Sequence, residues 1–358
     1  MRIGIDAREL CGRPTGVGRY LSGLLHAWSV SPRARSHEFV LYAPEPLVVA
    51  LDAHRFPTRL LAGPPGTWWE QVRLPMATSR DHLDLLFCPG YSIPLFRRLN
   101  AVVTIHDVSF SAHPEWFGVR EGFRRRWVTA HSASQARAII TVSQFSQREI
   151  VERLGVPASK VHVVPSGITR PAMVLSPIDS GARVLYAGSI FNRRRVPLLI
   201  QAFKALAEVH PHVTLDLVGD NRSYPFEDVR SLVSRLSLDD RVRWREYVSD
   251  EELGRLYKGA RAFAFLSEYE GFGLPPLEAL AAGVPVVMLD TEIAREICGD
   301  AALYVRAHDL AAVTRALELV LFDDRTRQRL LSAGQTVLAR YDWVQAADAT
   351  LLVLEQVG

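Results

Sequence analysis

Short apolar runs alternate with helical patterns along the whole chain. In the first half, the runs read RIGIDA, EFVLYA, DLLFCP, AVVTIHD, ARAIITVS and VHVVPS. In the second half, they read RVLYAGS, VTLDLVGD, VRWREYV, ARAFAFLS, VPVVML and ALYV. Nearly continuous apolar strands separated by amphipathic helices are typical of parallel sheets that are covered on both faces. The pattern therefore predicts an α/β protein with two Rossmann-like, doubly wound domains.

The boundary between the two series falls in a segment with loop composition. Residues 165–183 contain three prolines and several glycines and serines. We predict an N-terminal domain over residues 1–168 and a C-terminal domain over residues 178–341. The last segment, 342–358, reads as an amphipathic helix that begins after Asp342, and periodicity does not say which domain it packs on.

Composition is that of a globular protein. Of the 358 residues, 48% are hydrophobic and 23% are charged, and no apolar run reaches the length of a membrane span. The N-terminus carries no recognisable signal peptide. Cys11, Cys88 and Cys298 are far apart and have neither disulfide nor metal spacing, which fits a reducing cytoplasm.

Charge is distributed unevenly between the halves. Residues 1–170 carry 21 Lys+Arg against 13 Asp+Glu, whereas residues 171–358 carry 21 against 26. The basic half includes REGFRRRW (Arg120–Trp127), in which Phe123 and Trp127 interrupt the arginines. This stretch indicates attraction to an anionic membrane surface or to a phosphorylated acceptor. The alternative is a solvated helix face. No nucleic-acid partner is predicted.

The stretch EYEGFGLPPLEALAAGVPVV follows a predicted strand and begins a helix. Gly271 and Gly273 allow a sharp turn, and Pro275 suits the first helical turn. A helix N-terminus at this position favours phosphate. Glu270 and Glu278 would accept hydrogen bonds from sugar or ribose hydroxyls on either side of that phosphate. The alternative is an ordinary strand-to-helix connection.

Three further loops after predicted strands carry candidate chemistry. Arg193, Arg194 and Arg195 could neutralise a diphosphate without a metal, or form a solvated basic turn. Gly16 and Gly18 predict a loop that lets the backbone approach a ligand, or a plain turn. His106 could bind a substrate hydroxyl or transfer a proton, or be structural.

Several common motifs are missing from the sequence. There is no GxxxxGK[ST] phosphate loop, no Asp-x-Asp pair, no zinc spacing of His and Cys, and no GxSxG elbow. We therefore expect no metal site and no tightly bound cofactor.

Taken together, these motifs resemble the retaining glycosyltransferases of family 4, which have the GT-B fold. The resemblance covers nearly the whole chain and rests on EGFGLPPLEALAAGVPVV, with GVGRY, TIHDVSF, TVSQFSQREI, VHVVPSG and YVSDEEL in the family's order. It implies that the two domains face each other across a cleft and that the helix after Asp342 packs back on the first domain. It further implies that the first domain holds the acceptor and the second a nucleotide sugar.

The resemblance also implies roles for individual residues. Glu270 would contact the donor sugar and Glu278 the ribose, while Arg193 and Arg194 would bind the diphosphate and His106 the sugar. Arg194 stands where the family usually has lysine. Further donor contacts are implied for Gly16, Gly18, Phe272, Gly273, Leu274, Tyr247 and Val248.

The implied activity is metal-independent transfer of a hexosyl group with retention of configuration. A mannosyl group from GDP-mannose is our first choice, with UDP- and dTDP-sugars as alternatives, and the acceptor would be a glycan or lipid-linked molecule of surface polysaccharide assembly. We expect a cytoplasmic protein with peripheral contact to the inner face of the membrane. Two other hypotheses stay open: a GT-B epimerase or hydrolase acting on the donor alone, and a non-catalytic nucleotide-sugar-binding subunit. The base, sugar, acceptor and oligomeric state cannot be read from the sequence.

Overall fold

The computed structural model describes residues 1–13, 16–63, 66–95, 99–169 and 181–358. By their internal contacts, the residues form two compact units. Unit 1 comprises Met1–Ala112, Val119–Gly167 and Tyr341–Gly358, and unit 2 comprises His113–Gly118 and Ile168–Arg340. Most of the predicted linker, residues 170–180, lies outside the described residues. In the described part of the chain, no helix is long and apolar enough to cross a membrane.

Unit 1 contains a seven-stranded sheet in its described residues, with the order β3-β2-β1-β4-β5-β6-β7. Every neighbouring pair is parallel. The strands are β1 (Arg2–Asp6), β2 (Glu38–Ala43), β3 (Thr58–Leu60), β4 (Leu85–Cys88), β5 (Asn100–Thr104), β6 (Ala138–Thr141) and β7 (Val161–Val163). Because β1, β4, β5 and β6 are buried almost throughout, their sequences are nearly continuous apolar runs.

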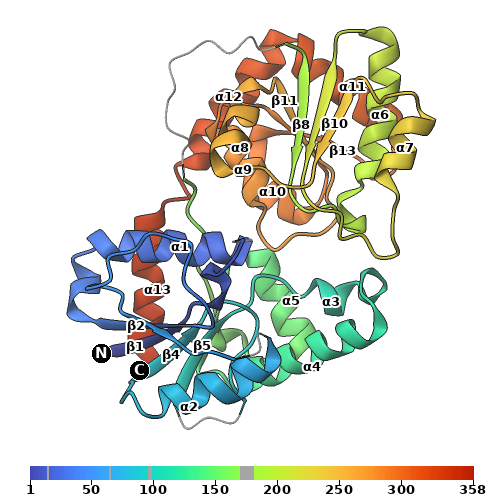
Figure 1. Cartoon of the computed structure of the whole chain (residues 1–358). Coiled ribbons are helices and arrows are strands. Elements are labelled where there is room, and N and C mark those ends of the chain that lie inside the picture. Colours follow the sequence, from blue (N-terminus) through green and yellow to red (C-terminus); the bar gives the residue numbers. More distant parts are fainter. Residues whose placement is uncertain (14–15, 64–65, 96–98, 170–180) are drawn as a thin grey trace. The chain divides into compact units, whose positions relative to one another are not determined.

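Helices cover the unit 1 sheet. They are α1 (Gly16–Val30), α2 (Leu74–Thr78), α3 (Ser109–Ala112), α4 (Val119–Gln135), α5 (Gln144–Leu154) and α13 (Trp343–Val357). A π-helical turn, η3 (Trp69–Arg73), leads directly into α2. The short 3-10 turns η1 (Arg8–Leu10), η2 (Arg33–Ser36) and η5 (Ala158–Lys160) lie in the connections, whereas η4 (Pro114–Trp116) belongs to the segment that is grouped with unit 2. In Figure 1, α1 lies on one side of the unit 1 strands, and α2 and α4 lie on the other.

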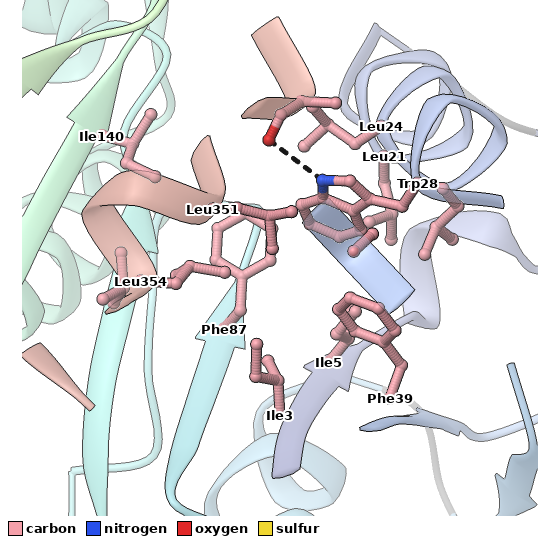
Figure 2. Packing of buried hydrophobic residues seen from close by; sticks show 14 of the residues in the cluster. Ile3, Ile5, Leu21, Leu24, Trp28, Phe39, Phe87, Ile140, Leu351 and Leu354 are labelled. Atoms are coloured by element: carbon pink, nitrogen blue, oxygen red, sulfur yellow. Dashed lines mark hydrogen bonds between the residues drawn. The ribbon is translucent and has the colours of Figure 1, made fainter. Parts of the chain in front are cut away.

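The C-terminal helix α13 completes the core of unit 1. Leu351 and Leu354 are fully buried among residues of β1, β4 and α1. The indole Nε1 of Trp28 donates a hydrogen bond to the carbonyl oxygen of Ala347 at 3.0 Å, as Figure 2 shows. The first residue of the helix, Trp343, fits where glycines leave room for its side chain: a Cβ at Gly23 or Gly167 would overlap it. The last residues of the chain are therefore built into the first unit.

Unit 2 contains a six-stranded parallel sheet in its described residues, with the order β10-β9-β8-β11-β12-β13. The strands are β8 (Arg183–Ala187), β9 (Thr214–Val218), β10 (Val242–Arg245), β11 (Ala262–Phe265), β12 (Val286–Leu289) and β13 (Ala302–Val305). The helices are α6 (Val196–Val209), α7 (Val229–Arg235), α8 (Asp250–Gly259), α9 (Leu274–Ala281), α10 (Glu292–Cys298), α11 (Leu310–Phe322) and α12 (Asp324–Leu338), with the turns η6 (Asn192–Arg194) and η7 (Gly299–Ala301).

The predicted fold class is confirmed: there are two parallel sheets, each with helices between its strands. The sequence pattern did not reveal β3, because its three residues are all exposed at the edge of the sheet and carry no apolar run. It also did not reveal that His113–Gly118 makes its contacts with unit 2.

One local prediction was wrong. Gly16 and Gly18 do not lie in a loop but in the first turn of α1. The apolar face of this helix, which includes Tyr20 and Leu21, packs into the core. This burial stabilises the helix, which begins at Gly16. Residues 14–15, just before it, lie outside the described residues.

Candidate functional site

The loops with the candidate chemistry follow two neighbouring strands at the centre of the unit 2 sheet. From β8 the chain continues to β9 on one side, whereas β11 lies on its other side, so the strand order reverses between β8 and β11. Crevices beyond the carboxyl ends of strands at such a reversal are the usual ligand sites of open α/β sheets. The loop after β8 holds the three arginines, and the loop after β11 holds Glu270. A backbone hydrogen bond of 2.8 Å from Glu268 N–H to Arg193 O joins the two loops.

Glu270 and Arg194 form a buried ion pair. The Arg194 guanidinium donates to both carboxylate oxygens of Glu270, at 2.7 and 3.2 Å, and also to the carbonyl oxygen of Ser189 at 2.9 Å. The Ser267 hydroxyl donates to the same carboxylate at 2.9 Å. The side chains of Arg194 and Glu270 are only 11% and 14% exposed. This bidentate contact fixes the orientation of the Glu270 carboxylate.

Both members of the pair are charged at neutral pH. Burial alone would raise the pKa of Glu270, but the positive charges of Arg194 and Arg193 and the hydrogen bonds to the carboxylate hold that pKa below its ordinary value. Burial likewise opposes the charge of Arg194, and the Glu270 carboxylate overcomes this effect and raises the arginine pKa. The site therefore holds a fixed negative charge beside the arginine loop.

The three arginines are engaged differently. Arg194 is bound to Glu270, and Arg195 contacts the Glu268 carboxylate at 2.8 Å. Arg193 is 9% exposed, and its closest approach to Glu270 is 4.0 Å, too long for a hydrogen bond. Its Nε has no hydrogen-bond partner among the described residues, and its guanidinium lies 4.5 Å from the ring centre of Phe191. Of the three, Arg193 alone makes no close contact with a carboxylate among the described residues, which leaves its guanidinium available to an anion.

The N-terminus of α9 is built without a side-chain cap. Gly273 precedes the first helical residue, Leu274, at a φ of +111°, and this conformation favours glycine over all other residues. Apart from its chain neighbours, no atom of the described residues lies within 4 Å of where a Cβ at Gly273 would be. The helix dipole and the open space suit an anionic group. Phe272 is buried just before this turn.

Glu278 lies in α9 and has a partner on α8. The hydroxyl of Tyr257 donates to Glu278 Oε2 at 3.0 Å and lies 3.4 Å from the carbonyl oxygen of Pro275. No motif pointed to Tyr257, nor to Ser267 beside Glu270. Both are common residue types whose positions become meaningful only when the helices and loops are folded together. Tyr247 and Val248 lie between β10 and α8, where the Tyr247 side chain is exposed.

His106 belongs to unit 1, at the carboxyl end of β5. Its ring Nε2 lies 2.9 Å from the carbonyl oxygen of Pro89, and because a carbonyl can only accept, Nε2 carries the proton. Burial lowers the pKa of His106, so the ring is neutral and Nδ1 keeps a lone pair. The Tyr20 ring packs edge-on against the His106 ring, with 4.9 Å between the ring centres. This arrangement can accept a hydrogen bond from a hydroxyl group.

Comparisons with protein families divide the chain in two. The family model described as Glycosyltransferase Family 4 matches residues 14–170, and the one described as Glycosyl transferases group 1 matches residues 176–337. Within the described residues, no cluster of three or more His, Cys, Asp or Glu side chains is arranged to hold a metal ion.

Individual relatives resemble most of the chain. An O-antigen chain mannosyltransferase B of Escherichia coli is 30% identical over 76% of this chain and 74% of its own length. An MMP α-(1→4)-mannosyltransferase of Mycolicibacterium hassiacum is 26% identical over 89% and 82%. Among solved structures, a sucrose-phosphate synthase of Thermosynechococcus elongatus has a TM-score of 0.79 at 19% identity over 99% and 98% of the two chains. Anabaena HepE, solved with UDP and glucose, has a TM-score of 0.77 at 20% identity over the whole of both chains.

Proposed function

Because the chain belongs to the glycosyltransferases, in the family described as Glycosyltransferase Family 4, we propose that it transfers a mannosyl group from a nucleoside diphosphate sugar with retention of configuration. The acceptor is a glycan or a lipid-linked glycan of surface polysaccharide assembly. One observation carries the proposal: the Arg193 guanidinium, which donates no hydrogen bond to a carboxylate among the described residues, lies beside the buried Glu270–Arg194 pair at the strand-order reversal of unit 2.

Each group in unit 2 has a role toward the donor. Arg193 binds the diphosphate, with the N-terminus of α9 at Gly273 and Leu274 adding its dipole. Glu270 accepts hydrogen bonds from sugar hydroxyls, and Glu278 accepts them from the ribose. Arg194 acts through Glu270, because its guanidinium is already bound to that carboxylate. Arg194 is thus a positioning residue in this proposal, rather than a second diphosphate ligand.

The chemistry follows from these charges. The bond between the anomeric carbon and the β-phosphate oxygen breaks, positive charge develops on the sugar, and negative charge develops on the departing diphosphate. Arg193 stabilises the diphosphate charge, while the Glu270 carboxylate, held by Arg194, faces the developing positive charge. The acceptor oxygen attacks from the side of the leaving group, whose phosphate takes the acceptor proton. This route retains configuration and requires no carboxylate nucleophile and no metal.

The choice of mannose and GDP rests on the relatives. Both the Escherichia coli and the Mycolicibacterium hassiacum relative are named as mannosyltransferases. HepE, the structural neighbour, was solved with UDP and glucose, and it is much less similar in sequence. We therefore keep GDP-mannose as the first donor to test and UDP- and dTDP-sugars as the alternatives.

A nucleotide panel tests the donor site. We expect GDP to raise the melting temperature more than UDP, dTDP or ADP, because a ligand at about 100 times its Kd stabilises the folded state by about 2.7 kcal/mol. The rise in melting temperature should persist in EDTA and disappear in the variant Glu278→Ala. A rise in melting temperature that requires Mg²⁺ would contradict the metal-free route. A larger rise with UDP than with GDP would make a UDP-sugar the proposed donor.

Incubation with GDP-mannose alone separates transfer from other donor chemistry. A glycosyltransferase should consume the donor slowly without an acceptor and rapidly with one. Rapid turnover without an acceptor would assign the chain to an epimerase or hydrolase. A donor that binds but never reacts would indicate a binding subunit.

Removing the Tyr257 hydroxyl should weaken the donor site without abolishing chemistry. In Tyr257→Phe, Glu278 loses a 3.0 Å hydrogen bond, so the Kd for the nucleotide should rise about 3- to 10-fold, as expected for about 1 kcal/mol. The matched control is Tyr304→Phe, whose hydroxyl binds backbone carbonyls of Ala294 and Gly299 elsewhere in unit 2. Isothermal titration would measure both, and an equal loss in the control would contradict the role of Tyr257.

A further inference from the structure

One face of α4 exposes a row of apolar side chains. Val119, Phe123 and Trp127 are spaced four residues apart, so they lie along one side of this 17-residue helix. They are 84%, 63% and 47% exposed, although large apolar side chains usually face the core. The same helix also contributes buried residues, which are Gly122, Thr129, Ser132 and Ala133. The row therefore leaves much of its apolar surface outside the core of unit 1.

A second row with the same spacing begins just before η3 and continues on η3 and α2. Trp68, Val72 and Met76 are 46%, 37% and 50% exposed. Figure 1 places α2 and α4 on the same side of the unit 1 strands. The backbone of Ile93 connects the two segments by hydrogen bonds. Gln71 Nε2 of η3 donates to Ile93 O at 3.2 Å, and Ser132 Oγ of α4 accepts from Ile93 N–H at 3.1 Å. We name the six residues of the two rows the α2–α4 face.

The charges around this face are mainly positive. Arg120, Arg124 and Arg125 are exposed on α4, and Arg80 is exposed just after α2. The acidic residues of these elements are few among the described positions. Glu121 is shared by Arg124 and Arg125, and Glu70 is buried and bound to Arg8. The surface of this face therefore complements an anionic partner.

We propose that the α2–α4 face docks on an anionic phospholipid bilayer. Exposed apolar rows on helices with arginines at their sides are the pattern of helices that lie in the interface plane of a membrane. Trp68 and Trp127 have amphipathic rings suited to the headgroup region, and arginine stems can lie along the apolar surface while their charges reach the lipid phosphates. An acidic protein would match the charge but would not require two exposed apolar rows.

The other side of the same sheet provides a comparison within the molecule. Val30, at the end of α1, and Val344 and Leu352, on α13, are also exposed, at 67%, 49% and 43%. They are scattered over two helices instead of forming rows at four-residue spacing. Single exposed apolar residues of this kind are common on protein surfaces. They allow a control that removes similar apolar area from unit 1.

Vesicle flotation tests the proposal with the full chain. The probes are phosphatidylcholine vesicles with and without phosphatidylglycerol, at low and high salt. The wild type should float with the phosphatidylglycerol vesicles, and less at high salt, because screening weakens the charge attraction. The triple variants Val119→Ser/Phe123→Ser/Trp127→Ser and Trp68→Ser/Val72→Ser/Met76→Ser should each bind about ten-fold more weakly. The control variant, Val30→Ser/Val344→Ser/Leu352→Ser, should float like the wild type. The melting curves of the two face variants and of the control should match that of the wild type.

Three outcomes would overturn the proposal. The wild type could fail to float with anionic vesicles, or the two face variants could float as well as the control. The third is a concentration-dependent dimer, abolished by the face variants and formed without flotation, which would assign the face to a second copy of the chain. Flotation requires no catalysis, so a negative result leaves the proposed transfer reaction untouched, and an inactive wild type leaves the docking result valid.

Discussion

Replacing Glu270 by glutamine is expected to lower the transfer rate by about 100- to 1,000-fold, the range seen when one electrostatic contact to a transition state is removed. The amide keeps the volume of the side chain but loses its charge. It also presents an NH₂ group to a guanidinium that can only donate. We expect a stability loss of about 3 kcal/mol as well, because Arg194 stays buried without its counter-ion. Initial rates and melting curves measured on the same samples would give both values.

A double variant separates the two effects of this substitution. The variant Glu270→Gln/Arg194→Met also removes the buried guanidinium that Glu270→Gln leaves without a counter-ion. The free energy of unfolding should therefore recover, while the transfer rate stays low. Recovery of the rate together with stability would mean that Glu270 serves only as a counter-ion. Glu251→Gln, an exposed carboxylate of α8 paired with Arg255, is the control for a charge change in unit 2 and should leave both quantities unchanged.

Arg193→Ala is expected to reduce kcat by about 10- to 100-fold for one lost charge-assisted hydrogen bond, and by more if the contact to the diphosphate is bidentate. The fold should be less affected than in Glu270→Gln, because in the described part of the chain no carboxylate lies within hydrogen-bonding distance of Arg193. Arg193→Lys should recover part of the rate, since it restores the charge but not the planar donors.

Chemical rescue makes this prediction specific. Guanidinium ions added at concentrations that leave the fold intact should raise the rate of Arg193→Ala toward that of the wild type. They should not change Arg222→Ala, which removes an exposed arginine paired with Asp220 in the same unit. A normal kcat in Arg193→Ala would exclude this residue from leaving-group stabilisation.

The fold was largely predictable because its strands are buried on both faces. β8 and β11 have continuous apolar runs, and such runs are the clearest sequence signal of a parallel sheet. β3 gave no such signal, since edge strands need not be apolar. The helical start at Gly16 was missed because glycine has low helix propensity, and burial of the following residues outweighs that preference.

The sequence proposed the residues of the candidate site, but it could not predict the contacts between them. The motif identified Glu270 and the three arginines, and it suggested that Arg193 and Arg194 act alike. The structure distinguishes them, because one guanidinium forms a bidentate pair with Glu270 and the other has an unpaired Nε. Which arginine meets a carboxylate depends on side-chain geometry across two loops, and spacing along one chain contains no such information.

The placement of α13 has a consequence for synthesis of the protein. Domains generally fold in order as the chain leaves the ribosome. Unit 2 is almost continuous in sequence, whereas the core of unit 1 lacks Leu351, Leu354 and the carbonyl partner of Trp28 until the last residues emerge. Most of unit 1 is synthesised before unit 2, yet we expect unit 1 to become protease-resistant last. Limited proteolysis of a released chain that ends at residue 340, compared with the full-length chain, tests this: unit 2 should resist cleavage in both, and unit 1 only in the longer chain.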